Sequence, residues 1–224
     1  MQNPWLSISW ENTIAEADRI RIEERYGSIN NFEVKFKEFG LNLIRALPEP
    51  YSGNKNSKVY CLNMNPGMWI SEFDNSDSML EMTIKNLRHE VEDYRWWNHV
   101  KDKDSKIHDG AKWTENILRG IRNVLGDNRI PSIFFVEYFP YHSEKGFKFP
   151  LYLPSYDYTD HLIMEAMREE KYIIIMRCKK LWFQRLPQLE NYNRIILPHT
   201  SRGIWMSPKN LGLEGKEHFI REIF

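Results

Sequence analysis

The chain has 224 residues, enough for one α/β domain of ordinary size and short for two. Lys and Arg number 31 and so do Asp and Glu, so the formal net charge is zero, which argues against a protein that coats nucleic acid through overall positive charge. Two cysteines cannot supply the four ligands of an iron–sulfur cluster or a Cys₄ zinc site. A hydrophobic content of 42% predicts a packed core.

The first fifty residues are charged and show helical spacing in ENTIAEADRIRIEERYG and FEVKFKEFGLNLIRAL. We expect residues 1–50 to form an N-terminal helical layer of a single domain that spans residues 1–224. The stretch LPEPYSGNKNS that follows predicts a loop. Charges appear by residue 11, unlike in a signal peptide, and the apolar runs are too short to cross a bilayer. We therefore expect a cytoplasmic protein without a membrane partner, and a monomer.

Four short apolar runs have the length of strands, and none alternates polar with apolar residues. Continuous apolar strands predict a parallel sheet that is covered on both faces. The predicted strands are Val59–Asn63, Ile133–Glu137, Tyr172–Met176 and Arg194–Leu197. The predicted helices are Ser78–Arg88, Trp113–Leu125, Thr159–Glu170 and Lys179–Leu186. Their alternation predicts a three-layer α/β fold, with a central four-stranded parallel sheet and helices on both faces.

Polar, proline and glycine residues gather directly after three of these strands, in NMNPG, EYFPYHS and PHTSRG. Ligands of parallel α/β sheets bind outside the carboxyl ends of the strands, so we expect the three loops to share a site. The alternative is that they are ordinary connecting loops, which favour the same residue types.

Two of the loops resemble motifs of the uracil-DNA glycosylase superfamily. LNMNPG resembles its first motif, closest to the single-strand-selective monofunctional and mismatch-specific branches, and HTSRG resembles its second. The strand ending at Glu137 falls where that family has its base-reading strand, and the layout extends from about Leu47 to Leu211. The resemblance implies a DNA-repair hydrolase that cleaves the bond between a flipped base and its sugar, in DNA or a single-stranded nucleic acid. We expect neither a cofactor nor a metal.

The resemblance also assigns roles to residues. Asn65 matches the residue that positions the attacking water, and His199 matches the imidazole that donates a hydrogen bond to the leaving base. From the residues alone, Asn65 could instead fix the turn and His199 could be structural. The expected base-binding residues are Met64, Trp69, Phe73, Glu137 and Tyr138. The expected phosphate-binding residues are Pro66, Gly67, Thr200, Ser201 and Arg202.

Glu137 departs from the family, which reads uracil with an Asn amide. A carboxylate only accepts hydrogen bonds, and facing the O4 atom of uracil it would cost about 1–3 kcal/mol, so we expect plain uracil to be a poor substrate. A protonated Glu137 would restore a donor, and an apolar pocket raises a carboxyl pKa. Further departures at Asn63, Thr200 and Gly203 leave two alternatives open: a catalytically silent relative that binds nucleic acid or a nucleotide, and a hydrolase of free nucleosides.

Overall fold

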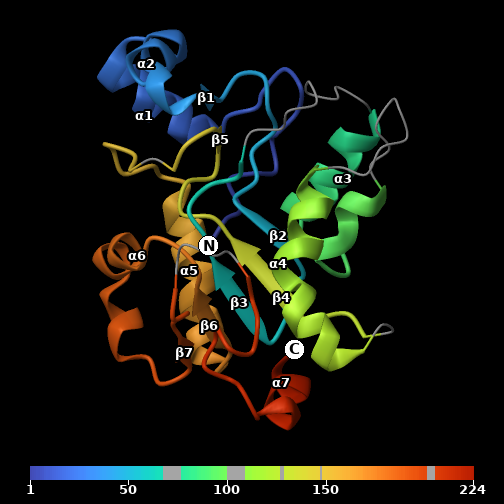
Figure 1. The fold of residues 1–224 in the computed structure, drawn as a ribbon. Coiled ribbons are helices and arrows are strands. Elements are labelled where there is room, and N and C mark those ends of the chain that lie inside the picture. Colours follow the sequence, from blue (N-terminus) through green and yellow to red (C-terminus); the bar gives the residue numbers. More distant parts are fainter. Residues whose placement is uncertain (68–76, 100–108, 127–128, 147, 201–204) are drawn as a thin grey trace.

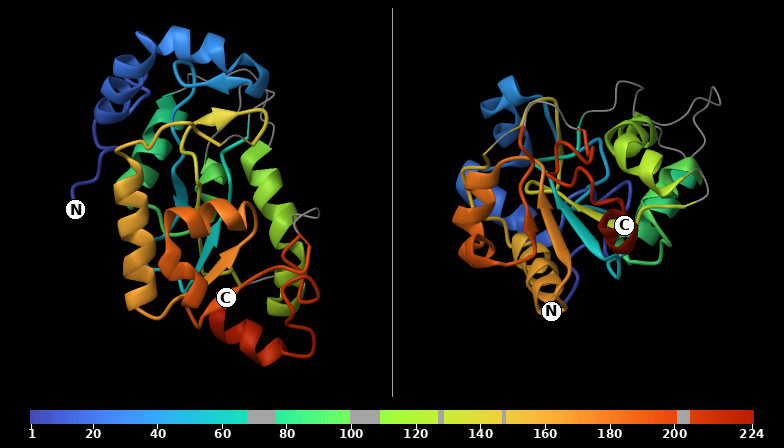
Figure 2. Two further views of the ribbon diagram at one scale, coloured as in Figure 1. Left: turned by 90° about the vertical axis from the view of Figure 1, so that its left-hand side faces the viewer. Right: turned by 60° about the horizontal axis from the view of Figure 1, so that its bottom comes forward.

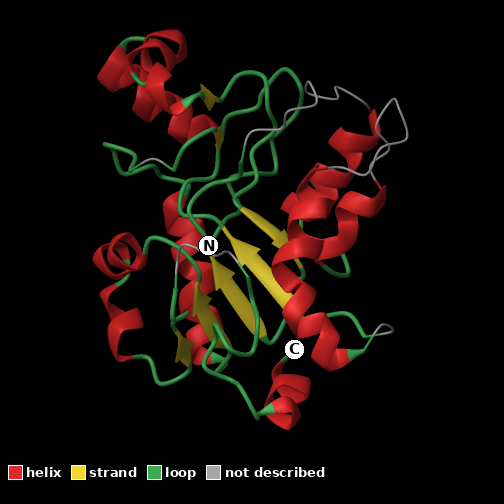
Figure 3. Ribbon diagram, viewed as in Figure 1, coloured by secondary structure: helices red, strands yellow, loops and turns green. Residues whose placement is uncertain are grey.

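A five-stranded sheet lies at the centre of the computed structural model, which describes residues 1–67, 77–99, 109–126, 129–146, 148–200 and 205–224 (Figures 1 and 3). The strand order is β2-β4-β3-β6-β7. The strands are β2 (Tyr51–Gly53), β3 (Val59–Leu62), β4 (Ile133–Val136), β6 (Tyr172–Ile175) and β7 (Ile195–Ile196). The β3, β4, β6 and β7 strands pair in parallel, and β2 pairs antiparallel with β4.

The expected α/β fold is present, and its four parallel strands belong to a mixed sheet of five strands. The added edge strand β2 lies in the stretch that the sequence predicts to be a loop. Its pairing aligns Tyr51 with Val136 and Gly53 with Phe134. Gly53 has φ 107°, and a Cβ there would lie 2.9 Å from the backbone oxygen of Ile133. Pairing with β4 holds this strand in place. Its three residues are too few to show the periodicity of a strand, so the sequence does not reveal it.

Helices cover both faces of the sheet (Figure 2). Alternate strand residues such as Tyr60 and Phe134 belong to one buried cluster, together with Leu162 of helix α5 (Tyr156–Arg168). The intervening residues, such as Cys61, belong to a second cluster with Ile121 of helix α4 (Asp109–Leu125). The helices after β3 are α3 (Asp77–Leu87), α4 (Asp109–Leu125), α5 (Tyr156–Arg168), α6 (Lys179–Arg185) and α7 (Glu217–Ile223), with 3₁₀ turns η2 (Tyr94–His99) and η3 (Pro187–Asn191).

Residues 1–50 contain α1 (Glu16–Tyr26), α2 (Ile29–Lys35), the 3₁₀ turn η1 (Lys37–Phe39) and strand β1 (Leu41–Asn42), which pairs with β5 (His142–Ser143). Asp18 of α1 is buried and accepts hydrogen bonds from the Tyr141 hydroxyl and the Ser155 N–H, each at 2.8 Å. These contacts tie the N-terminal segment to the loops that follow β4. In the part of the chain that the structure describes, no helix is both long enough and apolar enough to cross a membrane.

Candidate functional site

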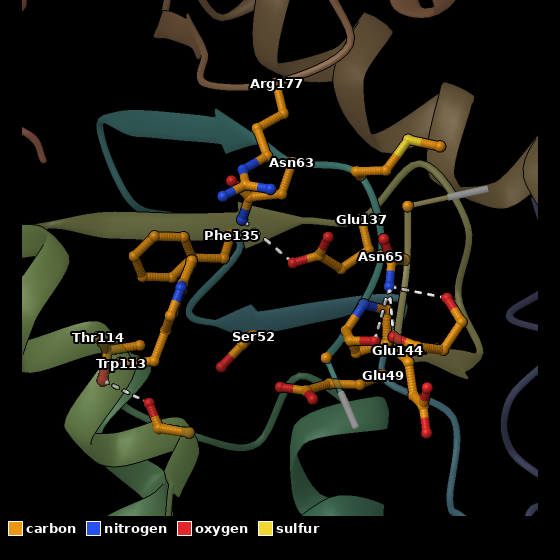
Figure 4. A pocket seen from close by; sticks show the side chains of 16 residues that line it. Glu49, Ser52, Asn63, Asn65, Trp113, Thr114, Phe135, Glu137, Glu144 and Arg177 are labelled. Carbon is orange, nitrogen blue, oxygen red and sulfur yellow. Dashed lines mark hydrogen bonds between the residues drawn. The ribbon is translucent and has the colours of Figure 1, made fainter. Parts of the chain in front are cut away.

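A cavity of about 400 Å³ opens at the carboxyl ends of β3, β4 and β6 (Figure 4). Its wall comes from residues 63–67 after β3, from Phe135 and Glu137 at the end of β4, and from Arg177 after β6. Glu49, Ser52, the first turns of α4 and residues of the segment 143–146 also line it. The volume is in the range of small-molecule sites, roughly 300–1,000 Å³, and the position is where parallel α/β sheets bind ligands.

Asn65 is fixed by its amide N–H₂ group. The Nδ2 atom donates to the Ser143 backbone oxygen at 3.0 Å, to the Ser143 Oγ at 2.8 Å and to the Pro66 oxygen at 3.0 Å. With its amide nitrogen held by acceptors, Asn65 directs its carbonyl Oδ1 away from them, and this oxygen can accept a hydrogen bond from a water molecule. Asn65 is thus positioned as an acceptor at the wall of the cavity.

Glu137 is oriented by Asn63. The Asn63 Nδ2 donates to one carboxyl oxygen of Glu137 at 3.1 Å, and Trp182 holds the Asn63 backbone by donating to its oxygen at 2.9 Å. The other carboxyl oxygen, Oε2, is buried and has no hydrogen-bond partner among the described residues. Burial raises the pKa of Glu137 to about 8, while the Asn63 hydrogen bond and the charge of Arg177 act against that rise. At neutral pH, Glu137 is therefore mostly a carboxylic acid with one unused O–H donor.

Glu49 is a second carboxyl in the same cavity. Burial raises its pKa well above the ordinary value, and the charge of Glu137 raises it further. Figure 4 shows the Glu49 and Glu137 side chains pointing into the same space. Burial therefore favours the protonated form of both carboxyls, and ionisation of one opposes ionisation of the other.

The aromatic part of the wall is formed by Trp113 and Phe135, whose ring centroids lie 5.7 Å apart at an interplanar angle of 64°. Trp113 is 37% exposed, so its ring is accessible to a ligand, whereas Phe135 is buried. Arg177 is exposed and has no ion pair with any residue that the structure describes. The cavity thus combines a flat aromatic surface, neutral acids and one cation.

The structure brings together one part of the expected site. The expected residues that line the cavity are Met64, Asn65, Pro66, Gly67 and Glu137. Tyr138, next in the chain to Glu137, lines a separate cavity of about 340 Å³. Its ring centroid lies 5.2 Å from the guanidinium carbon of Arg185, which is bound to Asp160.

The described residues of the second motif, His199 and Thr200, do not line the cavity. His199 is exposed; its backbone N–H donates to the Asn210 oxygen at 2.8 Å, and its ring lies against Gly212. Thr200 is also exposed, and its N–H donates to the Asn210 Oδ1 at 3.0 Å. The remaining expected residues, Trp69, Phe73, Ser201 and Arg202, lie outside the described residues.

The lining also contains residues that the sequence does not single out, among them Glu49, Trp113 and Arg177. Arg177 stands directly after the third predicted strand, so the rule that located Asn63 and Glu137 would have found it. Glu49 had no such signal, because the edge strand beside it was not recognised. Trp113 lies in a predicted helix whose inward face was not assigned.

Among the described residues, no group of three or more His, Cys, Asp or Glu side chains is placed to hold a metal ion. Comparison of the chain with protein-family models, with curated proteins and with solved structures found no match.

Proposed function

We propose that the protein is a uracil-DNA glycosylase-like hydrolase, which cleaves the N-glycosidic bond of a base that enters the cavity from DNA or a single-stranded nucleic acid. The observation that carries the proposal is the placement of the Asn65 amide and the Glu137 carboxyl in one cavity at the carboxyl ends of β3 and β4. A nucleobase is flat and has hydrogen-bonding edges, which suits a cavity with an aromatic wall and neutral acids.

Asn65 would orient the attacking water. Cleavage of this bond develops positive charge on the sugar and negative charge on the departing base, so an acceptor that orients water is sufficient and a strong base is not needed. The Ser143 contacts hold Nδ2 and leave Oδ1 for the water. Stabilisation of the departing base is then the larger demand on the site.

Glu137 would meet that demand. As a neutral acid it donates its Oε2 proton toward an oxygen or nitrogen of the base, which stabilises the negative charge that develops there. This is the role that the resemblance gives to His199. Because a carboxylic acid both donates and accepts, it also accommodates uracil. The expectation that uracil is a poor substrate then applies only above about pH 8, where Glu137 ionises.

The second candidate is a catalytically silent relative that binds a nucleotide or a nucleic acid. The observation that favours it is the exposed position of His199, away from the described wall of the cavity. Such a protein would retain binding in the cavity without cleavage.

A base-release assay separates the two candidates. Single-stranded and duplex oligonucleotides that carry uracil, hypoxanthine or another altered base are incubated with the protein at pH 7, and the free base is quantified. We expect release by the wild type, a loss of at least about 100-fold in Asn65→Ala, and a change below about threefold in His199→Ala. Binding of the oligonucleotides without release of any base would favour the silent relative, and a strong loss in His199→Ala would restore that residue to the reaction.

A further inference from the structure

Glu49 is held beside Glu137 by the backbone. The Glu49 N–H donates to the Pro140 oxygen at 2.8 Å, and the Glu137 N–H donates to the Pro50 oxygen at 2.9 Å. The Glu137–Pro50 bond continues the antiparallel register of β2 with β4, and the Glu49–Pro140 bond joins the same two segments two residues out of that register. The backbone of Glu49 is therefore anchored to the segment that follows Glu137.

The two carboxyls differ in their surroundings. Glu137 accepts a hydrogen bond from Asn63 and is influenced by the positive charge of Arg177. The Glu49 side chain has neither a hydrogen bond nor an ion pair with any described residue. The charged or titratable side chains that line the cavity with Glu49 are Glu137, Glu144 and Arg177.

The order of ionisation follows from this difference. The Glu137 carboxylate has two sources of stabilisation and Glu49 has none, so Glu137 loses its proton first, and its negative charge then holds the proton on Glu49. Burial and the charge of Glu137 therefore both favour the protonated form of Glu49, which has an O–H donor at the cavity. An acid that has no protein partner and lines a cavity can donate to an acceptor atom of a ligand.

We propose that Glu49 is a second base-binding residue, which donates a hydrogen bond from its protonated carboxyl to a carbonyl oxygen of the base. The inference rests on the proposed function and specifies its substrate class. Uracil and hypoxanthine carry such an oxygen, whereas adenine does not. Where hypoxanthine has its carbonyl oxygen, adenine carries an amino group, which is itself a donor and cannot accept from the Glu49 O–H, so adenine is disfavoured relative to bases with a carbonyl group.

The alternative role for Glu49 is that of a carboxylate base that takes a proton from water. Gln distinguishes the roles, because its amide retains a donor but cannot accept a proton in the reaction. If Glu49 donates to the base, Glu49→Gln stays within about threefold of the wild type, and Glu49→Leu loses about 10- to 100-fold in affinity for the base. If Glu49 is a general base, Glu49→Gln loses about 10²- to 10⁴-fold in the rate of base release.

The test is titration calorimetry with free uracil, hypoxanthine and adenine, combined with base release from oligonucleotides. Glu190→Leu, at an exposed position in η3, is the control for replacing a glutamate by leucine. Thermal unfolding of each variant establishes that it is folded, and Glu49→Gln keeps the test decisive if Glu49→Leu does not fold.

We expect the wild type to bind uracil and hypoxanthine more tightly than adenine, and Glu49→Leu to lose this preference. A wild type that binds and releases bases while Glu49→Leu behaves identically would overturn this inference alone. So would an equal loss in Glu49→Gln and Glu49→Leu. If the wild type neither binds nor releases any of the bases, the inference and the proposed function fail together.

Discussion

Replacing Glu137 by Gln should make the protein more stable at alkaline pH. In the unfolded chain this carboxyl ionises near its ordinary pKa of 4.5, whereas in the folded protein burial raises the pKa to about 8. The folded state therefore retains a proton that the unfolded state has lost, and the wild type loses stability as the pH rises from about 4.5 to about 8. Gln cannot ionise and avoids this loss, while its amide oxygen can still accept from Asn63.

The separation of the two pKa values corresponds to about 5 kcal/mol, because one pKa unit is worth 1.36 kcal/mol. Water that enters the cavity hydrates the carboxylate and lowers this figure. We therefore expect Glu137→Gln to be about 2–5 kcal/mol more stable, relative to the wild type, at alkaline pH than at acidic pH. This is a large part of the roughly 5–15 kcal/mol by which an ordinary domain is stable.

Urea unfolding of the wild type and Glu137→Gln at pH 5 and pH 9 measures the effect. Between pH 5 and pH 9, the free energy of unfolding of the variant should rise relative to that of the wild type by about 2–4 kcal/mol. Glu190→Gln, at an exposed position, controls for the loss of a carboxylate. The difference in free energy of unfolding between wild type and Glu137→Gln should depend on pH. If it were the same at pH 5 and pH 9, within about 0.5 kcal/mol, Glu137 would not be a buried neutral acid.

Three further substitutions test other parts of the structure. Asn65→Asp places a carboxylate against the Ser143 and Pro66 oxygens that accept hydrogen bonds from the Asn65 amide. We expect the free energy of unfolding in urea to fall by about 1–3 kcal/mol and base release to be lost. Unchanged stability and activity would contradict the anchoring of Asn65 by these oxygens. Trp113→Ala removes the exposed aromatic surface and should raise KM for base release by about 10- to 100-fold. An unchanged KM would show that the base does not stack on Trp113. Gly120→Ala on α4 brings a Cβ within 2.7 Å of the Ser207 Cα, so it should lower the free energy of unfolding by about 1–3 kcal/mol, and a stabilised variant would be the contrary result.

The parallel strands could be predicted because they carry continuous apolar runs, which a sheet buried on both faces requires. The same runs located Asn63 and Glu137, since polar residues that follow a buried strand fall at one end of the sheet. The edge strand β2 could not be predicted, because Pro48, Pro50 and Gly53 give its surroundings the composition of a loop.

The relation of His199 to the cavity was beyond sequence reasoning for a different reason. A residue that directly follows a parallel strand lies at the carboxyl end of the sheet. The direction of its side chain, however, depends on how the next segment packs. Here Asn210 binds the backbone of residues 199 and 200, and the imidazole lies against Gly212. The ionisation state of Glu137 was likewise set by burial, which a single residue in a sequence does not reveal.

A crystal structure of the protein with free uracil or hypoxanthine tests the central claim most directly, because it shows which side chains contact a base. We expect electron density for the base in the cavity, against the Trp113 ring and within hydrogen-bond distance of the Glu137 carboxyl, with a water molecule at the Asn65 Oδ1. A base bound elsewhere on the molecule, or an empty cavity at saturating concentrations of both bases, would contradict the central claim.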